Sequence, residues 1–369
     1  MEPIATPRRK MMGFARAQPI LRSARQVSDF ETRDETMPLL SVENLRVEYR
    51  TSRGSVRAVD GASLDIPEGA IVGLVGESGC GKTTVARAIM GVMPRNAAIT
   101  GGRLKFHGRN LTDLDRHSYR ALRWREIAFV PQSAMSSLNP VHRVGAQLIE
   151  VLTVRGSCDK REAWCRAVEL FDMVGLDPRR LQDYPHQFSG GMRQRVAIAM
   201  ALALEPKLVI ADEPVTALDV IVQRQVLDCI LGLQQRLGLS VLLVTHDMSV
   251  VAYACNRTVV MYAGRVMESG ATDVVLGSPK HPYTMGLCNA FPDLEAARHA
   301  LVPIEGRPPD LAEPPAGCRF APRCPFSLAR CEAEAPPPLD GDHEVSCWRH
   351  AEAAVLLDQA KEPRTWLRS

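Results

Sequence analysis

Two glycine-rich stretches of the sequence have the features of phosphate-binding loops. The first, GESGCGKT, occupies residues 76–83 and ends in Lys82 and Thr83. The second, SGGMRQR at residues 189–195, has a serine and two glycines followed by basic residues, but it lacks the lysine. Bare backbone N–H groups and the positive end of the helix dipole favour phosphate at the start of a helix. Two such loops in one chain need separate explanations.

The first loop matches the pattern G-x-x-x-x-G-K-[ST] between an apolar run and a helix-compatible segment. We expect Lys82 to reach the β- and γ-phosphates of a nucleotide and the hydroxyl of Thr83 to ligate Mg²⁺. A glycine-rich turn of purely structural use is the alternative, and this sequence context favours it less. No separate chemistry is assigned to Cys80. The residues expected to contact the nucleotide from this loop are Gly76, Glu77, Ser78, Gly79, Cys80, Gly81, Lys82, Thr83 and Thr84.

Two further apolar runs end in side chains that suit catalysis. LVIADEP ends in Asp212 and Glu213, and VLLVTHD ends in His246. Ligands of parallel α/β sheets bind beyond the carboxyl ends of the strands. We therefore expect Asp212 to hold Mg²⁺, Glu213 to deprotonate the attacking water, and His246 to contact the γ-phosphate. The alternatives are an exposed carboxylate pair without function and a structural histidine.

The composition is that of a globular protein with a sizeable core. Of the 369 residues, 46% are hydrophobic and 24% are charged, and the formal net charge is only +3. So small a positive excess argues against a nucleic-acid-binding surface. No apolar run approaches the roughly 20 residues of a membrane-spanning helix, and the basic start lacks the apolar stretch of a secretory signal. We therefore expect the chain in the cytoplasm, with its cysteines reduced.

The apolar patterns predict an α/β fold with a mostly parallel sheet. Residues 70–76 form a continuous apolar run typical of a strand buried on both faces, and residues 208–213 and 241–246 have the same character. The last two follow helix-compatible stretches, which indicates β-α-β crossovers. Between residues 39 and 69 the pattern alternates like two strands, whereas about 118–186 is Arg-rich, amphipathic and helical in pattern.

The motifs occur in the order found in ATP-binding subunits of ABC transporters, and the chain resembles that family over about residues 39–290. FSGGMRQR matches the family's signature loop, GESGCGKT its Walker A motif, LVIADEP its Walker B motif, ALD its D-loop, and VTHD its switch histidine. Gln132 stands at the position of the Q-loop glutamine, and Tyr49 at that of the aromatic residue that stacks on adenine.

The resemblance implies a P-loop NTPase (RecA-like) core with a mostly parallel sheet, an N-terminal antiparallel β portion, an inserted helical subdomain and a Cys-rich C-terminal extension. Residues 1–37 are basic and show no sustained periodicity, so we expect a disordered tail there. The resemblance implies an ABC ATPase domain at 38–290, with its helical subdomain at about 118–190, and a C-terminal region at 291–369. The implied ligands are ATP and Mg²⁺. The implied roles are catalysis for Glu213, His246 and Gln132, Mg²⁺ binding for Thr83, Gln132 and Asp212, and the D-loop for Asp219.

The resemblance also explains the second glycine-rich loop. In this family two ATPase subunits meet head to tail, and the signature loop of one covers the ATP in the Walker A loop of the other. Ser189, Gly190 and Gly191 should therefore bind the γ-phosphate of a partner's ATP. Dividing the phosphate contacts between subunits makes closure of the pair depend on ATP and its opening depend on hydrolysis. A plain helix N-cap is the alternative for SGG alone.

Other stretches are similar to the dipeptide and oligopeptide importer branch, which includes relatives handling nickel. They are SSLNPV, KHPYT, PIEGRPP and PAGCRFAPRC, whereas Val215 departs from the threonine usual in that branch. The implied partners are a second ABC ATPase subunit, identical or different, two integral membrane permease subunits and, indirectly, an external solute-binding protein. The implied location is the cytoplasmic face of the inner membrane, as a peripheral subunit without nucleic acid.

Four cysteines cluster near the C-terminus, at Cys318, Cys324, Cys331 and Cys347. In a cytosolic protein such clustering suggests a metal before a disulfide. Zinc ribbons prefer paired C-x₂₋₄-C knuckles, which are absent here, and thiolates spread over loops suit an iron–sulfur cluster at least as well. The resemblance favours a [4Fe–4S] cluster, with zinc or free thiols as alternatives.

Two other functions remain as alternatives at this point. A soluble ABC ATPase acting on DNA or ribosomes would contain long coiled coils or two ATPase cassettes, and this sequence shows neither. A regulatory ATP-binding module without turnover would not need Glu213 and His246, and both are present. The sequence therefore favours an ATPase that energises peptide import.

Overall fold

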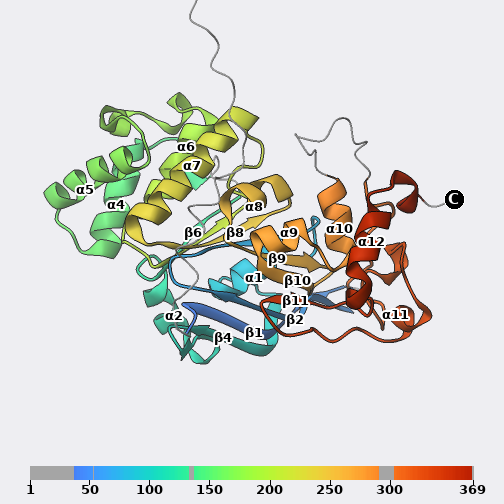
Figure 1. Ribbon diagram of the computed structural model, residues 1–369. Helices are drawn as coiled ribbons and strands as arrows, with labels where there is room; N and C mark the ends of the chain where they lie inside the picture. The colour runs from blue at the N-terminus through green and yellow to red at the C-terminus, as the bar shows by residue number, and fades with distance from the viewer. Residues whose placement is uncertain (1–36, 53, 133–136, 291–302, 368–369) are drawn as a thin grey trace, which may run out of the picture. The chain divides into compact units, whose positions relative to one another are not determined.

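The computed structural model describes residues 37–52, 54–132, 137–290 and 303–367 (Figure 1). The predicted basic tail lies outside this range except for Met37. The strands are β1 (Leu40–Thr51), β2 (Gly54–Ile66), β3 (Ile71–Val75), β4 (Ala97–Phe106), β5 (Arg109–Asn110), β6 (Ile127–Val130), β7 (Leu208–Asp212), β8 (Ser240–Thr245), β9 (Arg257–Tyr262), β10 (Arg265–Ala271) and β11 (His343–Val345). The helices are α1 (Lys82–Ile89), α2 (Arg116–Leu122), α4 (Val144–Gly156), α5 (Lys160–Met173), α6 (Gly190–Ala201), α7 (Val220–Leu237), α8 (Met248–Ala254), α9 (Thr272–Gly277), α10 (Pro282–Asn289), α11 (Ala329–Ala333) and α12 (Ala353–Ala360).

The larger sheet has the strand order β11-β10-β9-β3-β8-β7-β6. Strands β9, β3, β8, β7 and β6 run parallel, whereas β10 and β11 add an antiparallel edge. Every residue of β3, β7 and β8 is buried, as the continuous apolar runs predict. The prediction of a mostly parallel sheet is confirmed. Because the strands are parallel, the carboxyl ends of β3, β7 and β8 meet at one edge, where the motif residues follow.

The two faces of this sheet contribute to separate cores because side chains alternate along each strand. In β7, Val209 and Ala211 pack with residues of α6 and α7, whereas Leu208 and Ile210 pack with residues of α1. The sheet is therefore covered on both faces, and the loops at its edge start from buried elements.

A second, antiparallel sheet has the order β2-β1-β4-β5. Its apolar face shares one core with α1 and with one face of β3 and β8, so α1 lies between the two sheets (Figure 1). The predicted N-terminal antiparallel portion is confirmed. It places Tyr49 of β1 beside the start of α1, which follows the phosphate loop.

The region from 118 to 186 contains the amphipathic helices α4 and α5, as its pattern predicts, but it is not wholly helical. Strand β6 (Ile127–Val130) pairs in parallel with β7 and ends two residues before Gln132. The domain boundaries proposed from the sequence stay a prediction.

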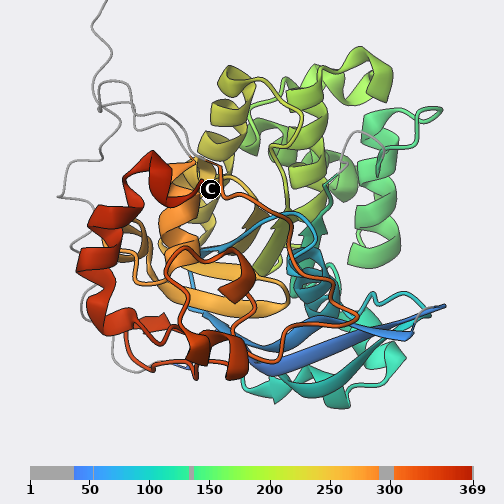
Figure 2. The same ribbon diagram turned by 90° about the vertical axis from the view of Figure 1, so that its right-hand side faces the viewer.

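The described C-terminal residues pack on the rest of the fold (Figure 2). Strand β11 pairs with β10, and Phe320, Phe326, Leu356 and Trp366 share a core with residues of β9, α8 and α10. Ordinary sheet pairing and apolar burial therefore hold this region in place.

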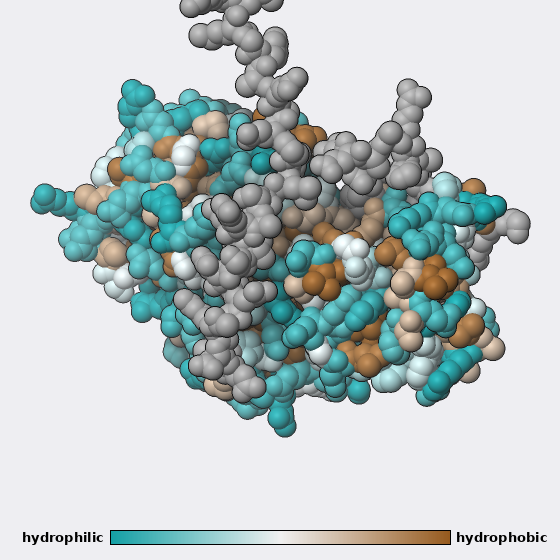
Figure 3. Space-filling view, in the orientation of Figure 1, coloured by the Kyte–Doolittle hydropathy of each residue, from teal (hydrophilic) through white to brown (hydrophobic). Residues whose placement is uncertain are grey.

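In the part of the chain that the structure describes, no helix combines the length and apolarity that crossing a membrane requires. On the face seen in Figure 3, hydrophilic residues predominate and hydrophobic residues are scattered among them.

Candidate functional site

The phosphate loop follows β3 and turns sharply into α1. Gly76 and Gly81 have φ angles of 156° and 107°, a region that side chains rarely allow. A Cβ atom would lie 2.0 Å from the carbonyl oxygen of Met261 at the first position and 2.3 Å from that of Ala58 at the second. Glycine is therefore required at both positions by the close approach of neighbouring backbone.

Lys82 lies within the loop that it terminates. Its residue is 5% exposed, and Nζ donates to the carbonyl oxygens of Gly76 at 2.6 Å and Glu77 at 2.9 Å. These contacts hold a positive charge over the backbone where the glycines leave room for phosphate oxygens. The role of Lys82 toward a nucleotide stays a prediction.

Thr83 and Asp212 meet between α1 and β7. Oγ1 of Thr83 lies 3.2 Å from Oδ1 of Asp212, whose residue is 3% exposed. Burial raises the pKa of the Asp212 carboxyl, and the nearby charge of Glu213 adds to this, although the hydrogen bond from Thr83 opposes it. A hydroxyl and a carboxylate are oxygen ligands of the kind that Mg²⁺ prefers, and a cation would favour the charged form of the buried acid. The pair therefore fits Mg²⁺.

The carboxylate of Glu213 is surrounded by three polar side chains. Gln132 donates from Nε2 to Oε2 at 2.7 Å, and Thr216 donates from Oγ1 to the same oxygen at 3.0 Å. Nδ1 of His246 lies 3.2 Å from Oε1. The structure thus brings together Glu213, His246 and Gln132 from three separate motifs, at the ends of β7, β8 and β6.

Sequence reasoning missed Thr216. It follows Glu213 by three residues, in a turn where Thr216 N–H donates to the Glu213 carbonyl oxygen at 3.2 Å. Thr216 is the last residue of the run DEPVT, but no distinctive spacing marks a threonine whose hydroxyl donates to the carboxylate of an earlier residue. Glu213 itself has a φ of 47°, which turns the chain sharply as β7 ends.

The remaining predicted contacts lie at helix starts. Oη of Tyr49 lies 3.3 Å from Oγ1 of Thr84, beside the first turn of α1. Oδ1 of Asp219 accepts from the N–H of Val222 at 3.0 Å and caps α7. The roles of both side chains toward ATP stay predictions.

The signature loop begins α6, as predicted. Ser189 caps the helix, with Oγ accepting from the N–H of Met192 at 3.4 Å. A Cβ atom on Gly191 would lie 2.2 Å from Cγ1 of Val222, so this glycine lets α6 approach α7. Across the described residues, no hydrogen bond or ion pair joins residues 189–191 to the phosphate loop of the same chain. The proposed binding of these three residues to a partner's ATP stays a prediction.

The prediction of an iron–sulfur cluster is wrong. Within the described ranges, no group of three or more His, Cys, Asp and Glu side chains is arranged to hold a metal ion. Burial raises the pKa of the Cys324 thiol to about 12 and that of Cys347 to about 11, which favours neutral thiols over the thiolates that bind metals. The zinc alternative has no support from these residues either. Cys318, Cys324, Cys331 and Cys347 instead line one small cavity of about 20 Å³.

Two residues from much later in the chain, Arg323 and Tyr283, contact the phosphate loop, and sequence reasoning missed both. Arg323 donates to the carboxylate of Glu77 from Nη1 at 2.7 Å and from Nη2 at 3.0 Å. Oη of Tyr283 accepts from the N–H of Glu77 at 2.9 Å. The two residues lie 246 and 206 positions after Glu77, so no local pattern could reveal these contacts. The signal that could have pointed to these two residues is their position in PAGCRFAPRC and KHPYT, two stretches that are similar to the dipeptide and oligopeptide importer branch.

The fold and this site define the chain as a P-loop ATPase. Residues 59–216 match the ABC transporter family, and residues 267–331 match the oligopeptide/dipeptide transporter C-terminal region. The chain therefore belongs to the ABC transporter family.

Several curated proteins are similar over most of their length. The dipeptide transport ATP-binding protein DppD of Bacillus subtilis is 44% identical over 332 residues, which cover 88% of this chain and 99% of DppD. The oligopeptide transport ATP-binding protein OppD of Escherichia coli is 45% identical over 304 residues, covering 82% of this chain and 89% of OppD. A probable peptide ABC transporter ATP-binding protein of Sinorhizobium fredii is 43% identical, and the match covers 86% of this chain and 97% of that protein.

Solved structures agree with this assignment. The dimeric ATP-binding cassette MJ0796, in a post-hydrolysis state bound to ADP and Pi, matches with a TM-score of 0.57 and 29% identity, covering 63% of this chain and 98% of that one. CbiO1 from Clostridium perfringens, part of the ABC transporter complex CbiONQ, matches with a TM-score of 0.58 and 27% identity, covering 65% and 91%.

Proposed function

We propose that this chain hydrolyses ATP to energise the uptake of dipeptides or oligopeptides through membrane partner subunits. The peptide assignment rests on the similarity to DppD and OppD, which are named as dipeptide and oligopeptide transport proteins, and on the C-terminal region matched at residues 267–331. The relatives named above give no support to the alternative of a soluble ATPase acting on DNA or ribosomes.

One observation carries the ATPase mechanism: Glu213, Gln132 and His246 converge beyond the ends of three neighbouring strands, next to the buried Asp212. In the proposed reaction, Glu213 accepts a proton from the water that attacks the γ-phosphate. Gln132 and Thr216 hold the carboxylate in a fixed orientation. His246 contacts the γ-phosphate from the adjacent strand end, so attacking and transferred groups are placed by rigid elements.

Lys82, Thr83 and Asp212 are assigned to the bound nucleotide. Lys82 exchanges its loop carbonyl partners for β- and γ-phosphate oxygens, which are stronger, charged acceptors. Thr83 and Asp212 would hold Mg²⁺, which when bound neutralises charge on the β- and γ-phosphates. Tyr49, whose Oη lies 3.3 Å from Oγ1 of Thr84 in the first turn of α1, is assigned to stack on the adenine ring.

The complete site is proposed to need a second ATPase subunit. Ser189, Gly190 and Gly191 begin α6, and Ser189 is exposed, as is Gln187 two residues before it. Backbone N–H groups at this helix start would bind the γ-phosphate of the partner's ATP. The solved MJ0796 cassette is itself dimeric.

The proposed location is the inner membrane, at its cytoplasmic face, through two permease subunits, with an external solute-binding protein delivering substrate. The stretch from Gln132 to Asn139 is proposed to dock on the permeases; residues 133–136 lie outside the described residues. Val141, just beyond it, is 72% exposed and offers apolar surface for such a contact.

The test is to purify the assembly from membranes and measure its ATPase activity with and without peptides. We expect di- or oligopeptides, added with the solute-binding protein, to stimulate hydrolysis, and amino acids or sugars to have no effect. The Lys82→Ala assembly should neither bind ATP nor respond, because the loop loses its phosphate-binding charge. Stimulation by an unrelated solute alone would overturn the peptide assignment, and ATP binding by Lys82→Ala would overturn the site.

A further inference from the structure

The C-terminal region reaches the phosphate loop through a buried arginine. The Arg323 side chain is 5% exposed, and its guanidinium forms a forked pair with both carboxylate oxygens of Glu77. The same guanidinium donates to the carbonyl oxygens of Ile304 and Glu305 and to Oη of Tyr262. A forked arginine with this many partners is fixed in position, so it fixes the carboxylate of Glu77 as well.

A buried tyrosine holds the backbone at the same residue. Tyr283 is fully buried, and its Oη accepts the N–H of Glu77 at 2.9 Å. Its ring packs against those of Tyr262 and Phe320, with centroids 4.6 and 5.3 Å away. Side chain and main chain of Glu77 are therefore both anchored from outside the nucleotide-binding motifs.

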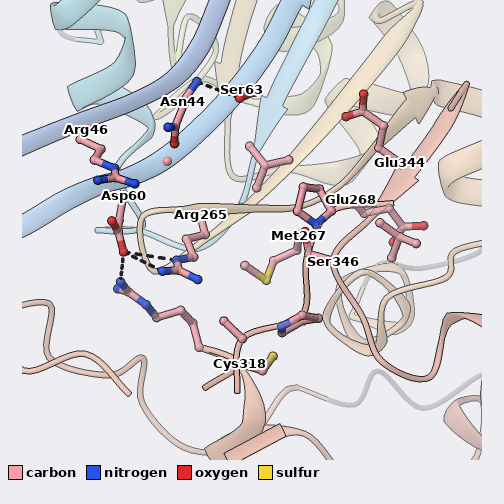
Figure 4. Close-up of a pocket in the computed structure, with 17 residues that line it drawn as sticks. Asn44, Arg46, Asp60, Ser63, Arg265, Met267, Glu268, Cys318, Glu344 and Ser346 are labelled. Carbon is pink, nitrogen blue, oxygen red and sulfur yellow. Dashed lines mark hydrogen bonds and ion pairs between the residues drawn. The ribbon is translucent and has the colours of Figure 1, made fainter. Parts of the chain in front are cut away.

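A second arginine supports the loop indirectly. Arg319 is 2% exposed, donates to the carbonyl oxygen of Ala263 at 3.0 Å and pairs with Asp60. The next residue, Gly264, donates its N–H to the carbonyl oxygen of Cys80 in the phosphate loop at 2.9 Å. Figure 4 shows Asp60 joined by dashed lines to Arg265 and to a second guanidinium, beside a pocket of about 260 Å³. Both arginines thus connect the C-terminal region to the loop.

The charge of Glu77 gives these contacts a consequence for ATP. Glu77 is the one acidic residue in GESGCGKT, and its side chain is 25% exposed. An unpaired carboxylate in a loop that binds a triphosphate would repel it. The guanidinium of Arg323 neutralises the charge of the Glu77 carboxylate and, by bonding both of its oxygens, prevents the side chain from rotating freely.

We propose that Arg323 and Tyr283 are positioning residues for ATP: they hold and neutralise Glu77, so that these two residues of the matched region 267–331 set the nucleotide affinity of the phosphate loop. This inference deepens the proposed ATPase function and rests on it. It assigns a use to the C-terminal region that requires no metal.

The experiment titrates the purified full-length chain with a fluorescent ATP analogue. Arg323→Gln should weaken binding about tenfold, since Glu77 becomes an unpaired negative charge next to the phosphates. Arg323→Gln combined with Glu77→Gln should return affinity to within about threefold of wild type, because the repelling charge is gone. Loss of packing alone would leave the double variant as weak as the single one, and that result would overturn the inference.

Arg349→Gln is the matched control. Arg349 is another C-terminal arginine, paired with Glu352 and bonded to the carbonyl oxygen of Phe326, and no described contact links it to the phosphate loop. It should bind ATP like wild type. A folded Arg323→Gln variant with wild-type affinity would overturn the proposal.

Tyr283→Phe gives a second arm that does not depend on the folding of Arg323→Gln. It keeps the ring in the core and removes only the hydroxyl that accepts the Glu77 N–H, so affinity should fall about threefold. Unchanged affinity would count against the proposal. Lys82→Ala distinguishes failure of this inference from failure of the proposed nucleotide site. If Lys82→Ala abolishes ATP binding while the Arg323 and Tyr283 variants bind ATP normally, only the positioning role of Arg323 and Tyr283 is wrong.

Discussion

At the scale of single residues, the sequence singled out Glu213, His246 and Gln132, which lie together in the structure, but it did not reveal the contacts of Thr216 and Arg323. Glu213 and His246 each follow a buried strand, and parallel strands end at one edge, whereas Gln132 was named from the family resemblance alone. The contact of Thr216 with Glu213 was not predicted, because it forms through a local turn that has no recognisable sequence pattern. The contact of Arg323 with Glu77 was not predicted, because the two residues are 246 positions apart in the sequence. Such contacts depend on how whole elements pack.

A second residue-scale feature is the buried, neutral His281. It is 1% exposed, caps α10 by accepting the N–H of Tyr283 on Nδ1, and donates its own N–H to Glu268. Burial lowers the pKa of His281 to about 4, despite the opposing charge of Glu268. The unfolded chain binds this proton near pH 6.5, so between pH 6.5 and 4 the unfolded state holds more protons.

We therefore expect the free energy of unfolding to decrease as the pH is lowered through that window, by roughly 1 kcal/mol per pH unit from this group. His281→Asn keeps an acceptor for the cap but cannot titrate, so its stability should decline less steeply. Urea unfolding at pH 7, 6 and 5 measures both slopes. Equal slopes would show that His281 does not account for the pH dependence.

At the scale of elements, the buried strands β3, β7 and β8 could be predicted because continuous apolar runs identify them. Strand β6 was missed, since four residues inside an otherwise helical region are too few to show a period. Strand β11 was missed for the same reason, because its three residues become a strand only by pairing with β10. Short strands are set by their neighbours.

The packing of α6 on α7 gives an element-scale prediction. Gly191→Ala would place a methyl group 2.2 Å from Cγ1 of Val222, which must push the start of α6 away from α7. Because Ser189 and its neighbours act on the partner's ATP in the proposed mechanism, we expect ATPase activity of the assembly to fall at least about tenfold. ATP binding by the single chain should not change.

Val222→Ala supplies the matched rescue. It removes the methyl group that the new Cβ meets, so the combination with Gly191→Ala should recover most of the activity. ATPase assays of the three variants, with ATP titrations beside them, give the comparison. A fully active Gly191→Ala assembly would contradict the close packing assigned to this position.

At the scale of the whole described chain, the C-terminal region shows where sequence reasoning went wrong. Clustered cysteines and prolines suggested loops held by a metal. The structure holds the region by β11, by an apolar core that includes Phe320 and Trp366, and by the buried pairs of Arg319 and Arg323. A cluster of one residue type in the sequence carries no information on these packing contacts.

In the proposed mechanism Glu213 takes the proton of the attacking water, while separate residues bind the nucleotide. Measuring ATP affinity and ATP hydrolysis together for Glu213→Gln tests it most directly. Glutamine keeps the size of the side chain but cannot accept the proton, so we predict affinity within a few-fold of wild type and hydrolysis reduced about 100-fold or more. Hydrolysis at the wild-type rate by this variant would contradict the account.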